Sequence, residues 1–339
     1  MATGVNLAVV GATGAVGREL LSILAERKFP VNEILCLASP QEVGQTIDFN
    51  GEKHTVKAAD TQVFKKADIA FFAVDTDISK TLAPLALDND CMVIDNSNAF
   101  RLDEKVPLIV PEVNPNDAKN HQGIIANPNC STIIMVVAIN PIHKAAGIKR
   151  VIVSTYQAVS GAGINGLREL TDHTRAYLSG DENPTPEVFQ YPIAFNIIPH
   201  IDNFVQDDYT REEMKMVWET QKIMHAPALK IAPTAVRVPV FRSHCEAIYL
   251  ETEQPLSAAQ ARAILSEAPG VKVHDDPDNK VYPMPKYASN TDAVYVGRIR
   301  KDISVENGLA LWVAADQIRK GAATNSVQIA ELVYDHNLY

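Results

Sequence analysis

Residues 6–17 read NLAVVGATGAVG, a short apolar run that leads into three glycines spaced three residues apart. Helical periodicity covers residues 15–27, and a second apolar run occupies residues 33–38. A strand, a glycine turn, a helix and a second strand in this order form the βαβ unit of a parallel sheet. The first forty residues therefore predict an α/β fold.

The glycine turn has the position of a phosphate-binding loop. Its glycines let the backbone approach a pyrophosphate, whose charge is held by N–H groups at the start of the helix. The spacing is GxxGxxG, and its place between strand and helix favours dinucleotide binding over a packing role. The candidate cofactor contacts in this loop are Gly11, Ala12, Thr13, Gly14, Ala15 and Val16.

The end of the second predicted strand leaves the form of the dinucleotide open. NAD enzymes often place an acidic residue there, and NADP enzymes place Arg or Ser. Here the chain reads Ser39-Pro40-Gln41-Glu42, with Ser39 and Gln41 as candidate contacts. Ser39 suits either cofactor, whereas Glu42 would repel a 2′-phosphate if it points inward.

The strand and helix patterns continue to about residue 125. Apolar runs at 69–74 and 91–95 flank a helical segment at 78–90, residues 46–56 form a hairpin around Asn-Gly, and Ile124-Ile125 is a last strand. We predict a Rossmann-like dinucleotide-binding domain over residues 1–127. A helical ending within residues 322–339 is expected to pack back on it.

The second half of the chain has a different pattern. Strands are predicted at 150–156, 236–240, 245–251, 293–300 and 309–314, and helices at 164–178, 211–224 and 257–268. Residues 183–199, rich in proline, form a long irregular connection. Strands that outnumber the helices between them indicate an α+β domain with a mixed sheet over residues 128–321.

Cys130 lies in a polar turn, Asn127-Pro128-Asn129-Cys130, before an apolar helix predicted at 132–142. The N–H groups and dipole of a helix N-terminus stabilise a thiolate and lower the pKa of a thiol. The same N–H groups could hold an oxyanion. Cys36 and Cys91 lie in apolar strands and are interpreted as buried structural cysteines.

A cysteine nucleophile beside a nicotinamide site indicates one reaction class. The thiolate adds to an aldehyde, a hydride leaves to the cofactor, and water or phosphate attacks the resulting thioester. Among nine histidines, His244 is the best candidate acid/base, because it ends the polar string from Arg237 to His244. Cys245 would point to the opposite side of its strand, into a core.

Composition narrows the class of protein further. The 339 residues carry 31 Lys and Arg against 41 Asp and Glu, a net charge of -10, which argues against nucleic-acid and anionic-membrane partners. The four cysteines show no CxxC spacing, so neither a metal site nor a disulfide framework is expected. No basic segment precedes an apolar run at the N-terminus, and we expect a cytoplasmic protein.

Several further motifs, in order along the chain, resemble those of the bacterial aspartate-semialdehyde dehydrogenase family. They are Gly11–Gly17, NSNAFR at 96–101, NPNCST at 127–132, STYQAVSGAG at 154–163, the segment Arg237–His244, and GAATN at 321–325. The resemblance implies NADP-dependent reduction of L-aspartyl 4-phosphate to L-aspartate 4-semialdehyde with release of phosphate, in lysine, threonine, methionine, isoleucine and diaminopimelate biosynthesis. It also implies a homodimer built on the sheet of the second domain.

The resemblance assigns roles to individual residues. It implies Cys130 as nucleophile, His244 as general acid/base, and Gln157 as the residue that orients the substrate. Substrate contacts would be Arg237 to the carboxylate, Glu212 to the amino group, Lys215 and Arg101 to the phosphate, and Asn129 beside the nucleophile. Ser160, Gly161, Gln317 and Asn325 would line the nicotinamide side. From spacing alone, Glu212 and Lys215 form a solvated ion pair.

Three alternative identities are open for the chain, and one pair of its residues departs from the family pattern. An N-acetyl-γ-glutamyl-phosphate reductase has similar chemistry, but its cysteine turn resembles Pro-Gly-Cys. A glyceraldehyde-3-phosphate dehydrogenase would carry Ser-Cys-Thr-Thr-Asn, which is missing here. A catalytically silent dinucleotide-binding paralogue would be expected to have lost residues such as Cys130 and His244. Gln41-Glu42 replaces the Arg-Ser pair frequent in the family, so NAD is expected to compete with NADP.

Overall fold

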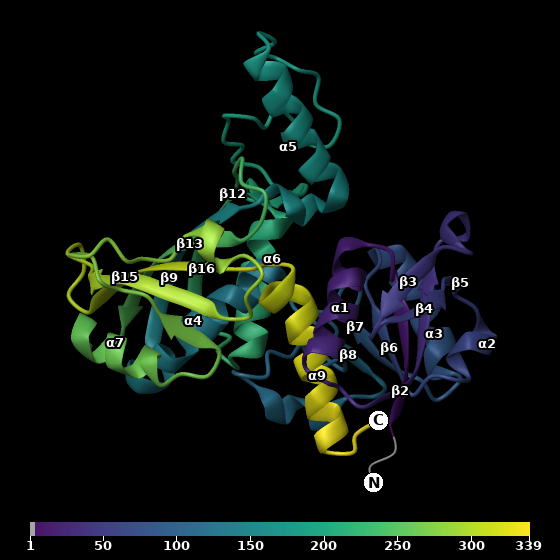
Figure 1. The fold of residues 1–339 in the computed structure, drawn as a ribbon. Coiled ribbons are helices and arrows are strands. Elements are labelled where there is room, and N and C mark those ends of the chain that lie inside the picture. Colours follow the sequence, from purple (N-terminus) through teal and green to yellow (C-terminus); the bar gives the residue numbers. More distant parts are fainter. Residues whose placement is uncertain (1–3) are drawn as a thin grey trace. The chain divides into compact units, whose positions relative to one another are not determined.

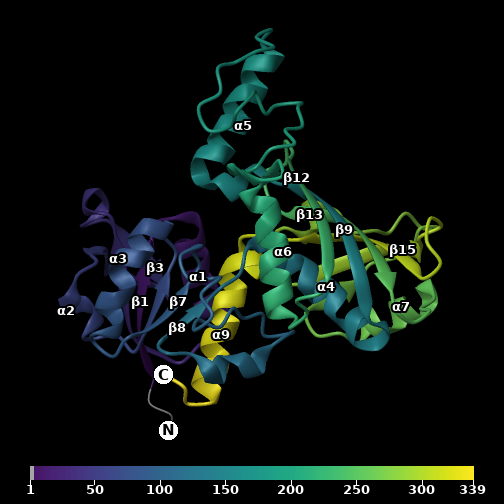
Figure 2. The ribbon, with the colours of Figure 1, turned by 180° about the vertical axis from the view of Figure 1, so that it is seen from behind.

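The computed structural model describes residues 4–339, which divide into two compact units (Figures 1 and 2). The first comprises the chain up to Asn129 together with Ala322–Tyr339, and the second comprises Cys130–Gly321. No helix in the described residues is long and apolar enough to cross a membrane.

The first unit is built on a six-stranded sheet in the order β5-β2-β1-β6-β7-β8, with every neighbouring pair parallel. This confirms the predicted Rossmann-like α/β fold. Its elements are β1 (Val5–Val10), α1 (Ala15–Glu26), β2 (Val31–Ala38), β3 (Thr46–Phe49), β4 (Glu52–Thr55), β5 (Lys57–Ala58), α2 (Thr61–Phe64), β6 (Ile69–Phe72), α3 (Thr76–Leu87), β7 (Met92–Asp95), β8 (Ile124–Ala126) and α9 (Thr324–Asp335).

The core of this unit is built from alternate residues of the strands, which point to one face of the sheet. Val5, Leu7 and Val9 of β1 share one buried cluster with apolar residues of α1, α9 and the β3–β4 hairpin. Side chains two apart on a strand point to the same face, so this face of the sheet is covered by both helices. Helix α9 lies in this unit, and its Val327, Ile329, Ala330 and Val333 are buried in the same cluster. The predicted Asn-Gly hairpin is also confirmed, with positive φ at Asn50 (54°) and Gly51 (82°).

The second unit contains a six-stranded sheet in the order β12-β9-β13-β16-β15-β14, and the sheet is mixed, as predicted. The β12–β9 and β14–β15 pairs are parallel, and the others are antiparallel. Its elements are α4 (Cys130–Ala146), β9 (Ile148–Gln157), α5 (Gly163–Leu178), β10 (Phe204–Gln206), β11 (Tyr209–Thr210), α6 (Arg211–Ile223), β12 (Lys230–Arg237), β13 (His244–Thr252), α7 (Ala258–Ser266), β14 (Val271–Val273), α8 (Pro285–Ala288), β15 (Val294–Lys301) and β16 (Gly308–Ala315).

One predicted strand is wrong. The run 236–240 was expected to be a strand, but β12 spans Lys230–Arg237 and the chain leaves the sheet after Arg237. Pro239 has no N–H for a ladder, and it ends the pairing. Pro233 is tolerated inside β12 because β12 lies at the sheet edge. The final helix also starts later than residue 322, because a π-helical turn occupies Arg319–Ala323.

Helices cover one face of the second sheet. Figures 1 and 2 show α4 and α7 on the same side of it. On the other face, Tyr156 and Trp312 are tilted against each other with ring centroids 5.3 Å apart, and Ile152 and Tyr249 are each 39% exposed. This face is therefore apolar, and α8 covers part of it, since Ala288 is buried in one cluster with Cys245 and Ala314.

Candidate active site

The ends of three neighbouring strands, β9, β12 and β13, bring candidate residues together at one end of the second sheet. Gln157 is the last residue of β9 and pairs in register with Arg237, the last residue of β12. The antiparallel β13 begins at His244, next to the pair between Cys245 and Tyr156. Sheet register therefore places three residues from distant parts of the sequence side by side.

Cys130 is the first residue of α4, as the sequence indicated. The N–H groups of the first helical turn and the helix dipole favour negative charge there. Gly321 lies close to it, since a Cβ at Gly321 would be 3.0 Å from the Cβ of Cys130. The other three cysteines are buried, and burial raises the pKa of Cys36 to about 11 and those of Cys91 and Cys245 to about 12.

Gln157 links the cysteine turn to α6. Its Nε2 lies 3.0 Å from Oγ of Ser131, 3.3 Å from Oγ1 of Thr155 and 3.2 Å from Oε1 of Glu212. Ser131 follows Cys130, so the amide fixes the start of α4 relative to Glu212. Sequence reasoning missed Ser131 and Thr155, although Thr155 is two residues before Gln157 and so faces the same way.

Glu212 and Lys215 form a pair on one turn of α6, with Nζ 3.0 Å from Oε2. Lys215 also donates to Asp202 at 2.9 Å. The expected solvated pair is wrong, because the Lys215 side chain is 14% exposed and that of Glu212 8%. Burial opposes the charge of Lys215, but Glu212 and Asp202 together raise its pKa above the usual value. Sequence reasoning missed Asp202.

Arg237 is buried beside this group. Its Nη1 donates to the carbonyl oxygen of Ala158 at 2.7 Å. Burial lowers the pKa of Arg237, while the charges of Glu212 and Cys130 act in the opposite direction. Gly161 gives the guanidinium its space, since a Cβ there would be 2.9 Å from Nη1 and 3.7 Å from Nε2 of His244.

His244 is fully buried and held by the backbone. Its Nδ1 accepts the N–H of Ala158 at 3.0 Å, so the neutral ring carries its proton on Nε2. Within the described chain Nε2 has no hydrogen-bond partner. Burial, together with the charge of Arg237, lowers the pKa of His244 to about 3. At neutral pH the ring is therefore uncharged and offers an N–H donor.

The glycine loop in the first unit fits a dinucleotide. A Cβ at Gly11, whose φ is +84°, would lie 2.3 Å from the carbonyl oxygen of Ala73, and one at Gly17 would lie 2.1 Å from that of Gly11. Only glycine permits these approaches, which leave the start of α1 open to a pyrophosphate.

Glu42 lies beside this loop. Its Oε2 accepts the hydroxyl of Ser39 at 2.7 Å, and this hydrogen bond, followed by one from Thr13, lowers the pKa of Glu42. Thr13 belongs to the glycine loop, so a carboxylate stands at the end of β2 facing the phosphate-binding turn. The Ser39 hydroxyl is thereby engaged by Glu42.

The remaining candidates are held by protein contacts. Gln317 donates to Ser160 and accepts the N–H of Ser243 at 2.8 Å, which fixes the residue before His244. In the first unit, Asn325 is fully buried and donates to Oδ1 of Asn127 at 2.7 Å. Arg101 donates to the carbonyl oxygen of Asn127 at 2.9 Å, and Asn129 is buried. Their contacts with cofactor or phosphate stay predictions.

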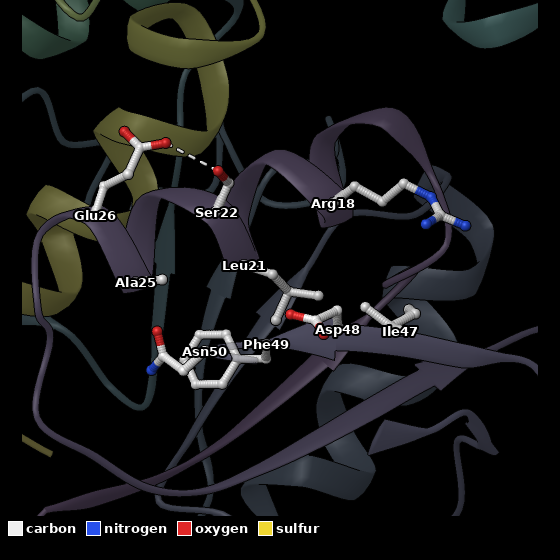
Figure 3. Close-up of a pocket in the computed structure, with 9 residues that line it drawn as sticks. All are labelled: Arg18, Leu21, Ser22, Ala25, Glu26, Ile47, Asp48, Phe49 and Asn50. Carbon is white, nitrogen blue, oxygen red and sulfur yellow. Dashed lines mark hydrogen bonds between the residues drawn. The ribbon is translucent and has the colours of Figure 1, made fainter. Parts of the chain in front are cut away.

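A groove of about 390 Å³ lies between α1 and the β3–β4 hairpin (Figure 3). Figure 3 shows Arg18 at one end and the Ser22–Glu26 hydrogen bond of 2.9 Å on its rim. It is lined by Arg18, Leu21, Ser22, Ala25, Glu26, Ile47, Asp48, Phe49 and Asn50. None of these residues is a predicted site residue.

Glu246 is a buried carboxyl that the sequence did not single out. It lies two residues after His244, it is 0% exposed, and neither oxygen has a partner in the described residues. Burial raises the pKa of Glu246 well above its usual value. The folded protein therefore keeps this proton at pH values where the unfolded chain has lost it.

We expect Glu246→Gln to be more stable than the wild type at pH 8. Above the unfolded pKa the wild-type free energy of unfolding falls by about 1.4 kcal/mol per pH unit, until the folded pKa is reached. The amide removes this loss. Denaturant unfolding from pH 5 to 9 at fixed protein concentration measures the difference. Glu251→Gln on the same strand, 3.9 Å from Lys149 and partly exposed, is the control; parallel curves for Glu246→Gln and wild type would contradict the prediction.

The chain is similar to known proteins over nearly its whole length. The family description "Semialdehyde dehydrogenase, NAD binding domain" matches residues 6–121, and "Semialdehyde dehydrogenase, dimerisation domain" matches residues 139–320. Aspartate-semialdehyde dehydrogenases of Aquifex aeolicus and Bacillus subtilis are 53% and 48% identical to the chain, over 99% and 100% of both chains respectively. The crystal structure of aspartate semialdehyde dehydrogenase II from Vibrio cholerae, complexed with ASA, superposes with a TM-score of 0.94 at 46% identity, covering 98% of each chain.

Proposed function

Because the chain belongs to the aspartate-semialdehyde dehydrogenase family, we propose that Cys130, His244, Gln157 and Arg237 carry out the reaction of that family. The enzyme is an NADP-dependent oxidoreductase that converts L-aspartyl 4-phosphate to L-aspartate 4-semialdehyde, in the biosynthesis of lysine, threonine, methionine, isoleucine and diaminopimelate. The observation that carries the residue assignment is the meeting of three strand ends beside the start of α4. The relatives do not support the acetylglutamyl-phosphate alternative.

Cys130 acts as the nucleophile. Its thiolate attacks the acyl carbon, the C–S bond forms, the C–O bond to phosphate breaks, and inorganic phosphate leaves. The nicotinamide cofactor, when bound, supplies the hydride chemistry in this direction. Once a hydride has added to the thioester carbon, the former carbonyl oxygen is an oxyanion. The C=O bond then re-forms, and the C–S bond breaks to release the aldehyde and regenerate the thiolate.

His244 stabilises that oxyanion. Its Nδ1 is occupied by the N–H of Ala158, so the ring enters the reaction through Nε2–H. A hydrogen bond to the oxyanion lowers the barrier without a proton leaving the ring. We therefore propose that His244 acts as a hydrogen-bond donor and not as a base. This differs from the general acid/base role that the family resemblance implied.

Charged side chains are proposed to bind the charged groups of the substrate. Arg237 presents a planar fork to the substrate carboxylate, and the carboxylate of Glu212 meets the amino group. Lys215 and Arg101 bind the phosphate, Gln157 orients the acyl group, and Asn129 lies next to Cys130 in the chain. Cofactor contacts are proposed for Gly11, Ala12, Thr13, Gly14, Ala15, Val16, Ser39, Gln41, Ser160, Gly161, Gln317 and Asn325.

The cofactor-binding domain, which we propose at residues 1–127 and 322–339, lies within the first unit, and residues 128–321 would carry catalysis and dimerisation. The family match of the second unit is to a dimerisation domain, and the enzyme forms a dimer. We assign the contact to the apolar face of its sheet opposite α4 and α7, around the exposed Ile152 and Tyr249. The site of action would be the cytoplasm, with no nucleic-acid or membrane partner.

The test is absorbance at 340 nm with the purified chain, L-aspartate semialdehyde, inorganic phosphate and NADP. We expect cofactor reduction that requires phosphate. No reduction by a folded protein that binds dinucleotide would overturn the proposal and favour a catalytically silent paralogue.

Cofactor choice gives a further prediction. The Glu42 carboxylate repels a 2′-phosphate and can accept hydrogen bonds from ribose hydroxyls. We expect NAD to compete with NADP in the wild type, and Glu42→Gln to raise kcat/KM for NADP several-fold with little change for NAD. Parallel titrations of both dinucleotides, by kinetics and by direct binding, measure the ratio.

Glu33→Gln is the matched control, since it removes the same charge from the opposite end of β2, where Glu33 is exposed. A wild type that prefers NADP by several orders of magnitude would contradict the prediction, as would equal cofactor ratios in Glu42→Gln and wild type.

A further inference from the structure

A loop beside the candidate active site is fastened to α5 by one buried carboxylate. Glu169 of α5 is 6% exposed. Its Oε2 accepts the N–H groups of Glu187 and Val188, and its Oε1 accepts that of Phe189 at 3.2 Å. Three N–H donors on one carboxylate fix the path of the loop, since moving it would leave a buried charge without partners.

A second residue on the same face of α5 holds the flanks of this loop. His173 lies one turn after Glu169, and its Nδ1 accepts the N–H of Ile193 at 3.4 Å. Its Nε2 lies 3.3 Å from the carbonyl oxygen of Thr185. The loop is thus attached on both sides of Phe189.

The loop places the ring of Phe189 against Arg237. The guanidinium carbon of Arg237 lies 5.5 Å from the ring centroid. Phe189 is partly buried against a cluster containing Val159, Leu170 and Ile193. Gly166 makes room for it, since a Cβ there would be 3.2 Å from Cζ of Phe189. The ring is therefore packed on one side, and its face is turned toward the cation.

Apart from the nearby charges of Glu212 and Cys130, the guanidinium has few other restraints. In the described chain its one hydrogen bond to protein runs from Nη1 to the carbonyl oxygen of Ala158. A single bond leaves rotation about that contact open, whereas an aromatic face attracts a guanidinium and defines its plane. A bidentate clamp on a carboxylate needs that plane to be set in advance.

We propose that Phe189, held by Glu169 and His173, is a positioning residue that orients Arg237 to receive the substrate carboxylate. This inference rests on the proposed role of Arg237. It predicts an effect on substrate binding that acts through the ring face and leaves the nucleophile unchanged.

The test compares Phe189→Leu with the replacement of Phe189 by 3,4,5-trifluorophenylalanine, which keeps the ring and weakens its negative face. For both we expect KM for L-aspartate semialdehyde to rise, by about tenfold in Phe189→Leu, with kcat within about twofold. The rate of Cys130 alkylation by iodoacetamide should not change. Phe195→Leu is the control, because Phe195 is 63% exposed in the same region and its ring is tilted against that of Tyr177, with the centroids 4.6 Å apart.

An unchanged KM in the fluorinated protein would overturn the proposal, whatever Phe189→Leu does, because the ring face would then have no role. Arg237→Lys separates this failure from a failure of the proposed function. A raised KM in Arg237→Lys with normal Phe189 variants rejects only the positioning role, whereas an unchanged KM in Arg237→Lys rejects the carboxylate clamp itself.

Discussion

Cys130→Ser is expected to lower kcat/KM by about 10⁴-fold or more, the largest effect of any single substitution here. Serine at this position is a far weaker nucleophile, because a helix N-terminus stabilises a thiolate but cannot ionise a hydroxyl at neutral pH. An alkoxide also leaves the reduced intermediate much less readily than a thiolate does. The phosphate-dependent assay at 340 nm measures the loss.

Thiol labelling gives an independent measurement. We expect iodoacetamide to modify one cysteine quickly at neutral pH and to lose that target in Cys130→Ser. Cys36, Cys91 and Cys245 are buried with raised pKa values, so they should react slowly. Cys91→Ala is the control and should keep both activity and labelling. Substantial activity in Cys130→Ser would show that another group is the nucleophile.

His244→Ala is expected to lower kcat by about 10²- to 10³-fold, the usual effect of losing one oxyanion donor. His244→Gln should recover part of this loss, because its amide N–H reaches a position close to that of Nε2–H. If His244 worked as a base, His244→Gln would recover none of the lost kcat, since glutamine cannot accept a proton at neutral pH.

The pH profile tests the same assignment. With its pKa at about 3, His244 stays neutral from pH 5 to 9. Any acidic limb of kcat/KM in that range should therefore be the same in His244→Gln and wild type. An acidic limb that is present in the wild type and absent in the variant would contradict the donor role and would show that His244 acts as a general base.

The first domain could be predicted largely from sequence, because its signals are local. The apolar run at 6–10, the glycine loop and the helix after it lie within 25 residues, and each follows from strand alternation, glycine geometry or helical periodicity. The position of Cys130 at a helix start follows in the same way from its polar lead-in. The predicted strand at 236–240 is wrong because the prediction rested on the apolar residues of this run. It gave too little weight to Pro239, which has no N–H to donate to a neighbouring strand.

The candidate site depends on contacts between residues far apart in sequence. Gln157, Arg237 and His244 meet because β9 pairs with both β12 and β13, and no local pattern specifies that pairing. The tautomer of His244 depends on the N–H of Ala158, 86 residues away. The burial of Glu212 and Lys215, the lack of a partner for the Glu246 carboxyl among the described residues and the place of Arg237 over the Phe189 ring also depend on neighbours that only tertiary packing supplies. The sequence by itself determined which chemical groups this protein carries and the local elements that hold them. The tertiary structure decided their charges, tautomers and partners, because burial and distance act between segments that the chain brings together only when it folds.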